Sequence, residues 1–195
     1  MLKILLIRHA KTKGNLLGCY IGRTDESLCQ EGIQLLLGKS YPVAEQLYVS
    51  PMSRCIQTAD LIYKNIPQKI VENLKECDFG DYENKNYMEL KENTSYQSWV
   101  DSHGKLPFPN GESQECFRQR CCQAFCEILD EAFEKGYESI AIVTHGGTIM
   151  SIMECYGKPE ASFYNWRVKN AGGYLLKLNE KNWTERKEIC VRCSF

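Results

Sequence analysis

Hydrophobic residues along this chain fall into two patterns, short continuous runs and longer stretches with helical spacing. Residues 2–7 form an apolar run that only Lys3 interrupts, and residues 140–143 form a second, unbroken one. Such runs are typical of strands that a parallel sheet buries on both faces. Weaker strand patterns cover residues 46–50, 69–71, 173–178 and 189–192.

Stretches with helical spacing separate several of these runs. Apolar residues recur every three or four positions over 53–63, with Ser53 as the expected N-cap, and again over about 148–156. The longest such pattern runs from Phe117 to Phe133, and Gly136 ends it. Alternating strands and helices favour the α/β class. We therefore expect one domain over residues 1–195, a three-layer α/β/α arrangement with a mostly parallel sheet and helices on both faces.

One segment, at about 84–112, departs from this alternation. It is polar and aromatic, and it closes with Pro107, Pro109 and Gly111. This composition predicts an irregular lid or a short helical excursion rather than core. Tyr96, Trp99 and Phe108 are expected to pack this segment, and they would influence substrate choice if it covers a pocket. His103 is expected to be an ordinary surface histidine.

The charge balance excludes several classes of partner. The chain has 24 Lys and Arg against 25 Asp and Glu, a net charge of −1, which argues against nucleic-acid and anionic-membrane binding. No apolar stretch reaches the roughly 18 residues of a spanning helix, and Arg8 and His9 interrupt the first run before it could act as a signal peptide. We expect a cytoplasmic protein, and no feature of the sequence indicates its oligomeric state.

Cysteine is the unusual component of the composition. The chain has 11 Cys, which we expect to be reduced and mostly buried thiols. Only Cys190 and Cys193 have the spacing of a zinc-ligand pair, and a second pair is missing. We therefore expect no metal site.

Two of the three histidines occupy equivalent places. His9 and His145 each follow a buried apolar run, which puts both at the carboxyl ends of parallel strands, where open α/β sheets bind ligands. Small residues follow both histidines, so an anion could approach the backbone closely. The helix that begins after Gly147 is expected to point free N–H groups at the same place.

Two arginines are expected beside these histidines. Arg8 precedes His9 directly, and Arg54 lies near the start of a helix, where an arginine has no capping role. Two arginines and two histidines that converge without metal ligands are typical of a phosphate pocket.

Six stretches of the sequence now suggest a family. They include Arg8-His9-Ala10 with Asn15, and they occupy residues 6–15, 20–25, 50–59, 74–83, 111–113 and 143–146. In this order they resemble the histidine phosphatase superfamily, also called the phosphoglycerate mutase-like family. The resemblance implies a phosphatase that needs neither metal nor cofactor and acts on a small phosphorylated metabolite.

The resemblance also implies a role for each matching residue. His9 would be the nucleophile that accepts the phosphoryl group, and Glu76 would be the proton donor. Arg8, Arg54 and His145 would hold the phosphoryl oxygens. The resemblance favours Glu76 over the rival carboxylate Glu83. Substrate-binding positions would be Arg8, Asn15, Ile21, Gly22, Arg54 and Gly146.

The chain departs from the family pattern at two places. Ala10 replaces the usual glycine, which is tolerable only if residue 10 does not need a positive φ. Tyr82-Glu83-Asn84 replaces the usual Trp-Glu-Gly, which would alter the pocket wall rather than its chemistry.

Three functional hypotheses remain open at this stage. The leading one is phosphomonoester hydrolysis, and similarity to bacterial α-ribazole phosphatases over residues 20–25 and 76–82 makes α-ribazole 5′-phosphate a candidate substrate. The second is a phosphoglycerate mutase, which the lack of arginine between residues 84 and 110 disfavours. The third is a non-catalytic phosphate-binding module or a cysteine-based redox module, neither of which has a use for Glu76.

Overall fold

The fold is organised around one mixed sheet. A computed structural model describes the backbone of residues 1–195 and every side chain except that of Arg186. The seven strands lie in the order β3-β2-β4-β1-β6-β7-β5. β1 to β4 run parallel to one another, and β6 is antiparallel to both β1 and β7. The strands are β1 (Leu2–Arg8), β2 (Gln46–Val49), β3 (Gln68–Ile70), β4 (Ser139–Thr144), β5 (Gly157–Lys158), β6 (Gly173–Leu178) and β7 (Ile189–Ser194).

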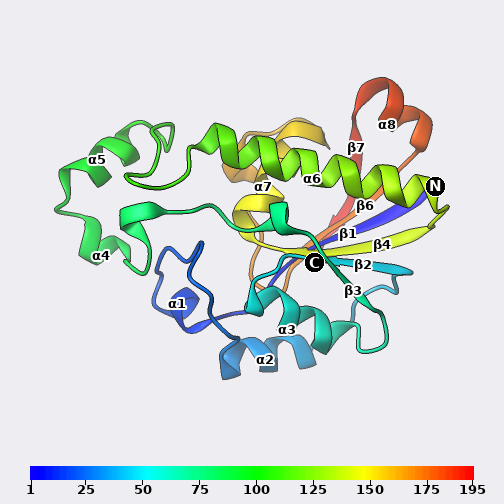
Figure 1. Ribbon diagram of the computed structural model, residues 1–195, viewed down its shortest axis with the longest axis horizontal. Helices are drawn as coiled ribbons and strands as arrows, with labels where there is room; N and C mark the ends of the chain where they lie inside the picture. The colour runs from blue at the N-terminus through cyan, green and yellow to red at the C-terminus, as the bar shows by residue number, and fades with distance from the viewer.

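Helices cover both faces of this sheet, as Figure 1 shows. Helices α6 (Gln114–Glu134) and α7 (Gly146–Tyr156) lie on one face, and α2 (Gln30–Leu37) and α3 (Ser53–Ile62) lie on the other. Successive residues of β1 therefore enter different cores: Ile4 and Leu6 pack with residues of α6 and α7, whereas Leu5 and Ile7 pack with residues of α3. Burial on both faces is the reason for the apolar run from Ile4 to Ile7, and the predicted α/β/α fold is confirmed.

Two helix starts differ from the sequence prediction. Ser53 is the first residue of α3 rather than its N-cap, because the carboxylate of Asp25 accepts hydrogen bonds from the Ser53 backbone N–H (2.7 Å) and Oγ (2.6 Å). A capping group from another loop cannot be recognised by local spacing. Helix α7 begins at Gly146, two residues earlier than predicted, with His145 as its N-cap.

Several short elements complete the chain. Helix α2 was not predicted, because Gly32 interrupts its apolar pattern; that glycine lies against the backbone of Lys11, where a Cβ would clash. The other short elements are α1 (Lys13–Leu16), α8 (Glu180–Arg186) and three 3₁₀ turns at Glu72–Leu74, Gly80–Tyr82 and Phe163–Trp166.

The excursion is helical. It contains α4 (Tyr87–Leu90) and α5 (Thr94–Asp101), which project beyond one end of the sheet in Figure 1. Its aromatic rings pack together and onto Tyr20: the Trp99 centroid lies 5.9 Å from that of Tyr96 and 5.1 Å from that of Phe108. Aromatic burial of this kind accounts for a segment that has few aliphatic residues.

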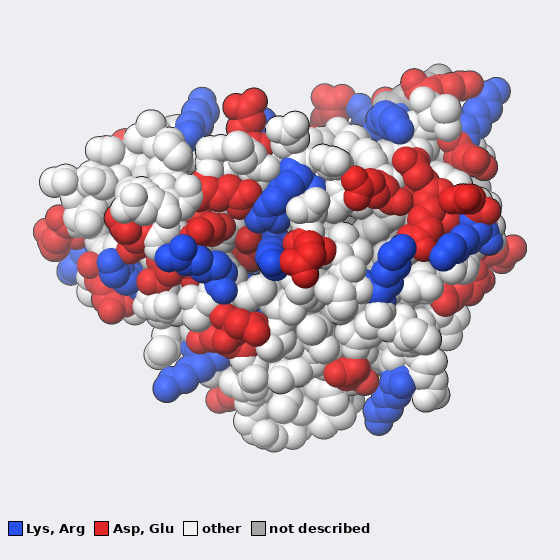
Figure 2. All heavy atoms as spheres, viewed as in Figure 1, with Lys and Arg blue, Asp and Glu red and all other residues white. Residues whose placement is uncertain are grey.

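The surface agrees with the balanced charge of the sequence. Acidic and basic side chains are interspersed over the face drawn in Figure 2.

No helix in the described part of the chain is long and apolar enough to cross a membrane. Among the described side chains, no group of three His, Cys, Asp or Glu is placed to hold a metal ion.

Candidate active site

The two histidines meet at the carboxyl edge of the central strands. His9 follows β1 and His145 follows β4, and these strands are direct neighbours in which Arg8 pairs with Thr144. The two imidazole rings lie edge to face with centroids 5.2 Å apart. The matched strand ends thus bring together residues that are 136 positions apart in the chain.

The hydrogen bonds of His9 define its tautomer. Its Nδ1 lies 2.7 Å from the carbonyl oxygen of Ala10. Because a carbonyl only accepts, Nδ1 carries the proton, and the neutral ring keeps its lone pair on Nε2. His9 is 4% exposed. The ring is therefore fixed with a nucleophilic nitrogen that has no protein partner among the described atoms.

His145 is held in the opposite tautomer. Its Nδ1 lies 3.3 Å from Nε of Arg54, which can only donate, so Nδ1 accepts and Nε2 donates to Oγ of Ser50 at 2.7 Å. Both ring nitrogens thus contact protein groups. His145 and Arg54 are fully buried. Together with His9 they form a floor of the site that lies outside the lining of the neighbouring cavity.

Arg8 and Glu76 lie on a cavity of about 470 Å³ that opens beside this floor. Nη1 of Arg8 donates to the carbonyl of Val168 (2.8 Å), and its buried Nε has no partner among the described atoms. Gly146 lets this guanidinium lie close to the start of α7, since a Cβ there would come within 3.3 Å of Nε. Aromatic rings form much of the wall: Tyr20, Phe79, Trp99, Phe108, Phe117, Phe163 and Tyr164.

Glu76 is bound to the N-terminus of α7. One of its oxygens accepts from the Gly147 N–H (3.0 Å), and the other accepts from the N–H of Cys77 (3.1 Å). A Cβ at Gly147 would overlap this carboxylate. The sequence predicted that N–H groups at this helix start would point at a bound anion. The Gly147 N–H instead donates to the protein's own carboxylate. Burial raises the pKa of Glu76, and the two N–H groups, Arg54 and Arg8 oppose that rise.

The rival carboxylate, Glu83, is saturated by protein donors. It accepts hydrogen bonds from the backbone N–H of Gly22, Arg23 and Phe79 and from the Thr24 hydroxyl. It does not line the cavity. Glu76 has only two described donors and borders the cavity together with Arg8, whereas four donors occupy Glu83, which favours Glu76 as the proton donor.

The other predicted substrate-binding residues lie in different surroundings. Gly146 lines the cavity, whereas Asn15, Ile21 and Gly22 lie outside its lining. The carbonyls of Ile21 and Gly22 accept from Arg54. The Asn15 carboxamide accepts from Nδ2 of Asn170 (3.0 Å), which also donates to the His9 carbonyl (3.1 Å).

Several residues that shape the site carry no recognisable signal in the sequence. Asn170 and Val168 contact the backbone of His9 and the side chain of Arg8, but they lie far along the chain in a segment without a recognisable motif. At the cavity rim, Arg118 pairs with Glu154 (3.5 Å). Arg167 lies over the ring of Tyr164 and also lines the cavity.

Both departures from the family pattern have structural explanations. Ala10 is buried without a positive φ, and its N–H donates to Thr58, so the extra methyl fits. Asn84 has φ of +61°, and asparagine tolerates this left-handed region better than most residues. Tyr82 is buried behind the cavity wall rather than in it.

The buried histidines predict that the protein loses stability on acidification. Burial, reinforced by the charge of Arg54, holds the pKa of His9 and of His145 well below the usual value. As the pH falls below about 6.5, the unfolded chain gains protons that the folded chain does not, so the free energy of unfolding should fall by up to roughly 1.4 kcal/mol per pH unit for each histidine. Glu76, with its raised pKa, acts in the opposite direction and offsets part of this slope.

Urea unfolding at about pH 7.5, 6.5 and 5.5 measures this slope. His145→Asn should flatten it, and His103→Asn, which changes the surface histidine, should leave it unchanged. Equal stability of the wild type at the three pH values would contradict the assignment of two neutral, buried imidazoles.

Histidines and arginines gathered at the carboxyl edge of an α/β sheet, beside an aromatic cavity, suit an enzyme that handles phosphate groups. Within this class of enzyme, residues 4–188 match the histidine phosphatase superfamily (branch 1), and the chain belongs to this family.

Individual relatives agree with this family. The adenosylcobalamin/alpha-ribazole phosphatase of Escherichia coli is 28% identical over 197 residues, covering 95% of this chain and 94% of the relative. The metal-independent phosphoserine phosphatase of Arabidopsis thaliana is 29% identical over 194 residues, covering 93% and 78%. The crystal structure of the alpha-ribazole phosphatase from Shigella flexneri superposes with a TM-score of 0.81 at 26% identity, covering 98% and 95%. The chain is thus a phosphatase of the histidine phosphatase type.

Proposed function

We propose that the chain hydrolyses phosphomonoesters of small metabolites through a phosphohistidine at His9, without a metal ion. The observation that carries this proposal is the fixed tautomer of His9, in which Nδ1 donates to Ala10 and Nε2 keeps its lone pair. The low pKa of this buried ring keeps it unprotonated and able to attack at neutral pH.

In the first step Nε2 of His9 forms a bond to phosphorus, and the bond from phosphorus to the ester oxygen breaks. Glu76, in its protonated form, gives its proton to the departing oxygen. Arg8 and the buried Arg54 stabilise the charge that spreads over the three remaining phosphoryl oxygens, and His145, whose two ring nitrogens bind Arg54 and Ser50, holds the Arg54 guanidinium in place.

In the second step the ionised Glu76 takes a proton from water, and the water oxygen attacks phosphorus. The nitrogen–phosphorus bond breaks, phosphate leaves, and His9 and protonated Glu76 are restored. A carboxyl group that must serve as acid and then as base works best with a pKa raised toward neutrality, which is the direction that burial imposes on Glu76.

We propose α-ribazole 5′-phosphate as the preferred substrate. The flat aromatic walls of the cavity suit a heteroaromatic ring joined to a sugar phosphate. The similarity to relatives named for α-ribazole supports this choice.

A second candidate is the phosphate ester of a small amino or hydroxy acid. Arg118 and Arg167 at the rim could bind a carboxylate, and Glu154 could bind an amine. A relative named as a phosphoserine phosphatase is consistent with this candidate. A mutase has less support, because none of the basic side chains of the excursion lines the cavity.

A substrate panel with a metal chelator present tests both choices. We expect kcat/KM for α-ribazole 5′-phosphate to exceed that for phosphoserine and 3-phosphoglycerate by about tenfold or more, since aromatic stacking contributes roughly 1 kcal/mol or more for each ring contact. Arg167→Gln should leave this preference unchanged.

A higher kcat/KM for phosphoserine or 3-phosphoglycerate than for α-ribazole 5′-phosphate would favour the amino or hydroxy acid ester, provided that Arg167→Gln abolishes this difference. Loss of all turnover on chelation would contradict the metal-independent mechanism.

A further inference from the structure

Arg54 is a buried cation without a carboxylate partner. It is fully buried, and no described carboxylate lies within ion-pair distance of it. Its guanidinium donates instead to the backbone carbonyls of Gly22 and Thr24, both at 2.8 Å, and more weakly to that of Ile21 at 3.4 Å. Carbonyl groups orient the guanidinium but leave its charge unneutralised, so the charge remains available to an anion.

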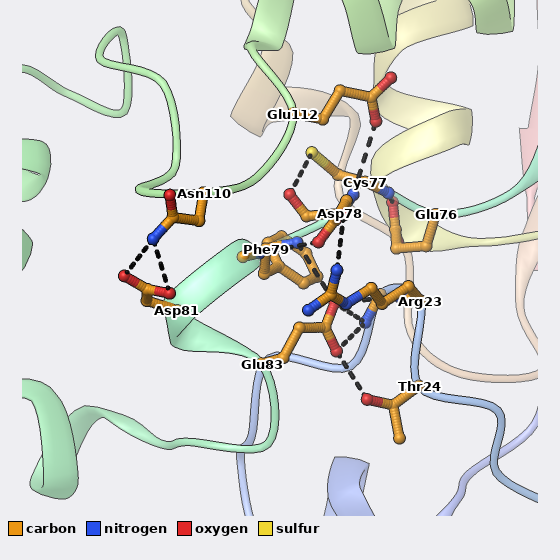
Figure 3. A network of polar contacts seen from close by, with 12 residues as sticks. Arg23, Thr24, Glu76, Cys77, Asp78, Phe79, Asp81, Glu83, Asn110 and Glu112 are labelled. Carbon is orange, nitrogen blue, oxygen red and sulfur yellow. Dashed lines mark hydrogen bonds and ion pairs between the residues drawn. The ribbon is translucent and has the colours of Figure 1, made fainter.

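The loop that carries these carbonyls depends on Glu83. Its carboxylate accepts from the N–H of Gly22 (3.1 Å) and of Arg23 (2.9 Å) and from the hydroxyl of Thr24 (2.8 Å). Figure 3 shows this carboxylate directed at the loop that carries Arg23 and Thr24. A fourth bond, from the N–H of Phe79 (3.2 Å), ties the carboxylate to the segment that follows Glu76.

Two residues link Glu83 and Arg54 directly. Gly22 donates its N–H to Glu83 and accepts a hydrogen bond from Arg54 at its carbonyl, and Thr24 does the same with its hydroxyl and its carbonyl. Hydrogen bonds in such a chain polarise one another. A Cβ at Gly22 would overlap the Cys77 carbonyl, so the loop is packed closely against the segment that leads from Glu76 to Glu83.

We propose that Glu83 is a positioning residue for the phosphate site: it orders the 22–24 loop so that the loop carbonyls aim the Arg54 guanidinium at the phosphoryl group. This inference rests on the proposed function, in which Arg54 contacts that group. Glu83 itself touches neither the cavity nor the reacting atoms. Its negative charge stays on the far side of the loop, where it orders the backbone without pairing with the guanidinium.

The dissociation constant of inorganic phosphate, measured by calorimetry near neutral pH, tests the inference. Glu83→Gln keeps the size of the side chain but replaces one acceptor with a donor that faces other donors. We expect it to weaken phosphate binding roughly 10- to 100-fold, the range for lost hydrogen bonds to a charged group. Asp81→Asn is the matched control: Asp81 lies two residues away, and among the described donors its carboxylate accepts only from Asn110.

A double-mutant cycle separates positioning from a general loss of structure. If Glu83 acts through Arg54, the double variant Glu83→Gln/Arg54→Gln should bind phosphate no more weakly than Arg54→Gln alone. Additive losses, or unchanged phosphate binding by folded Glu83→Gln, would overturn the inference.

A second variant is available if Glu83→Gln does not fold. Thr24→Val removes one hydrogen bond of the same chain and should weaken phosphate binding by a smaller factor. Unchanged phosphate binding by Thr24→Val would also overturn the inference. Failure of the wild type to bind phosphate would instead contradict the proposed function.

Discussion

Replacing His9 with Asn should lower kcat by on the order of 10⁴- to 10⁶-fold, the range seen when the covalent nucleophile of a cooperating catalytic unit is removed. Asparagine has no lone pair on nitrogen that could attack phosphorus. The flanking arginines and the cavity remain, so phosphate should still bind. Steady-state assays and phosphate calorimetry on the same preparation measure both effects.

The surface histidine supplies the control for this substitution. His103 is exposed and makes no hydrogen bond to a proposed catalytic residue in the described structure, so His103→Asn should keep wild-type kcat. Turnover by His9→Asn within tenfold of the wild type would assign the nucleophile to another group.

Glu76→Gln should slow hydrolysis of alkyl phosphates by roughly 10²- to 10⁴-fold, because glutamine cannot give a proton to the leaving oxygen. The size of the effect should depend on the leaving group. A nitrophenolate leaves without a proton, so phosphoenzyme formation from p-nitrophenyl phosphate should be nearly unaffected. Rapid-quench measurement of that first step, with both esters, tests this contrast.

The two carboxylates are distinguished by the same pair of substrates. Glu83→Gln should impair both esters by a similar factor, because it weakens binding of the shared phosphoryl group. If Glu83→Gln instead shows the dependence on leaving group, and Glu76→Gln does not, Glu83 is the proton donor.

Much of the fold follows from local patterns in the sequence. The apolar runs of β1 and β4 and the long period of α6 are local signals, and all three elements form where the pattern predicts them. The start of α3 could not be predicted, since its capping carboxylate comes from Asp25, 28 positions away. Short elements such as α2 gain their stability from packing rather than from propensity.

The candidate site likewise combines residues that the sequence predicts with contacts that only the folded structure shows. His9 and His145 were predictable because strand ends share one sheet edge. The link from Asn170 to the His9 carbonyl joins residues 161 positions apart, and no periodicity reveals it. The occupation of the Gly147 N–H by Glu76 is likewise a tertiary contact. Sequence therefore indicates the chemical groups, whereas tertiary contacts determine their tautomers and protonation.

Transfer of the phosphoryl group through Nε2 of His9 is tested most directly by trapping the phosphoenzyme. The wild-type enzyme is mixed with a ³²P-labelled phosphomonoester, quenched rapidly without acid, digested in base and analysed by peptide mapping. We expect a base-stable, acid-labile label on His9 that forms and decays at rates compatible with kcat. Turnover without any such label, or a label on a residue other than His9, would contradict this transfer.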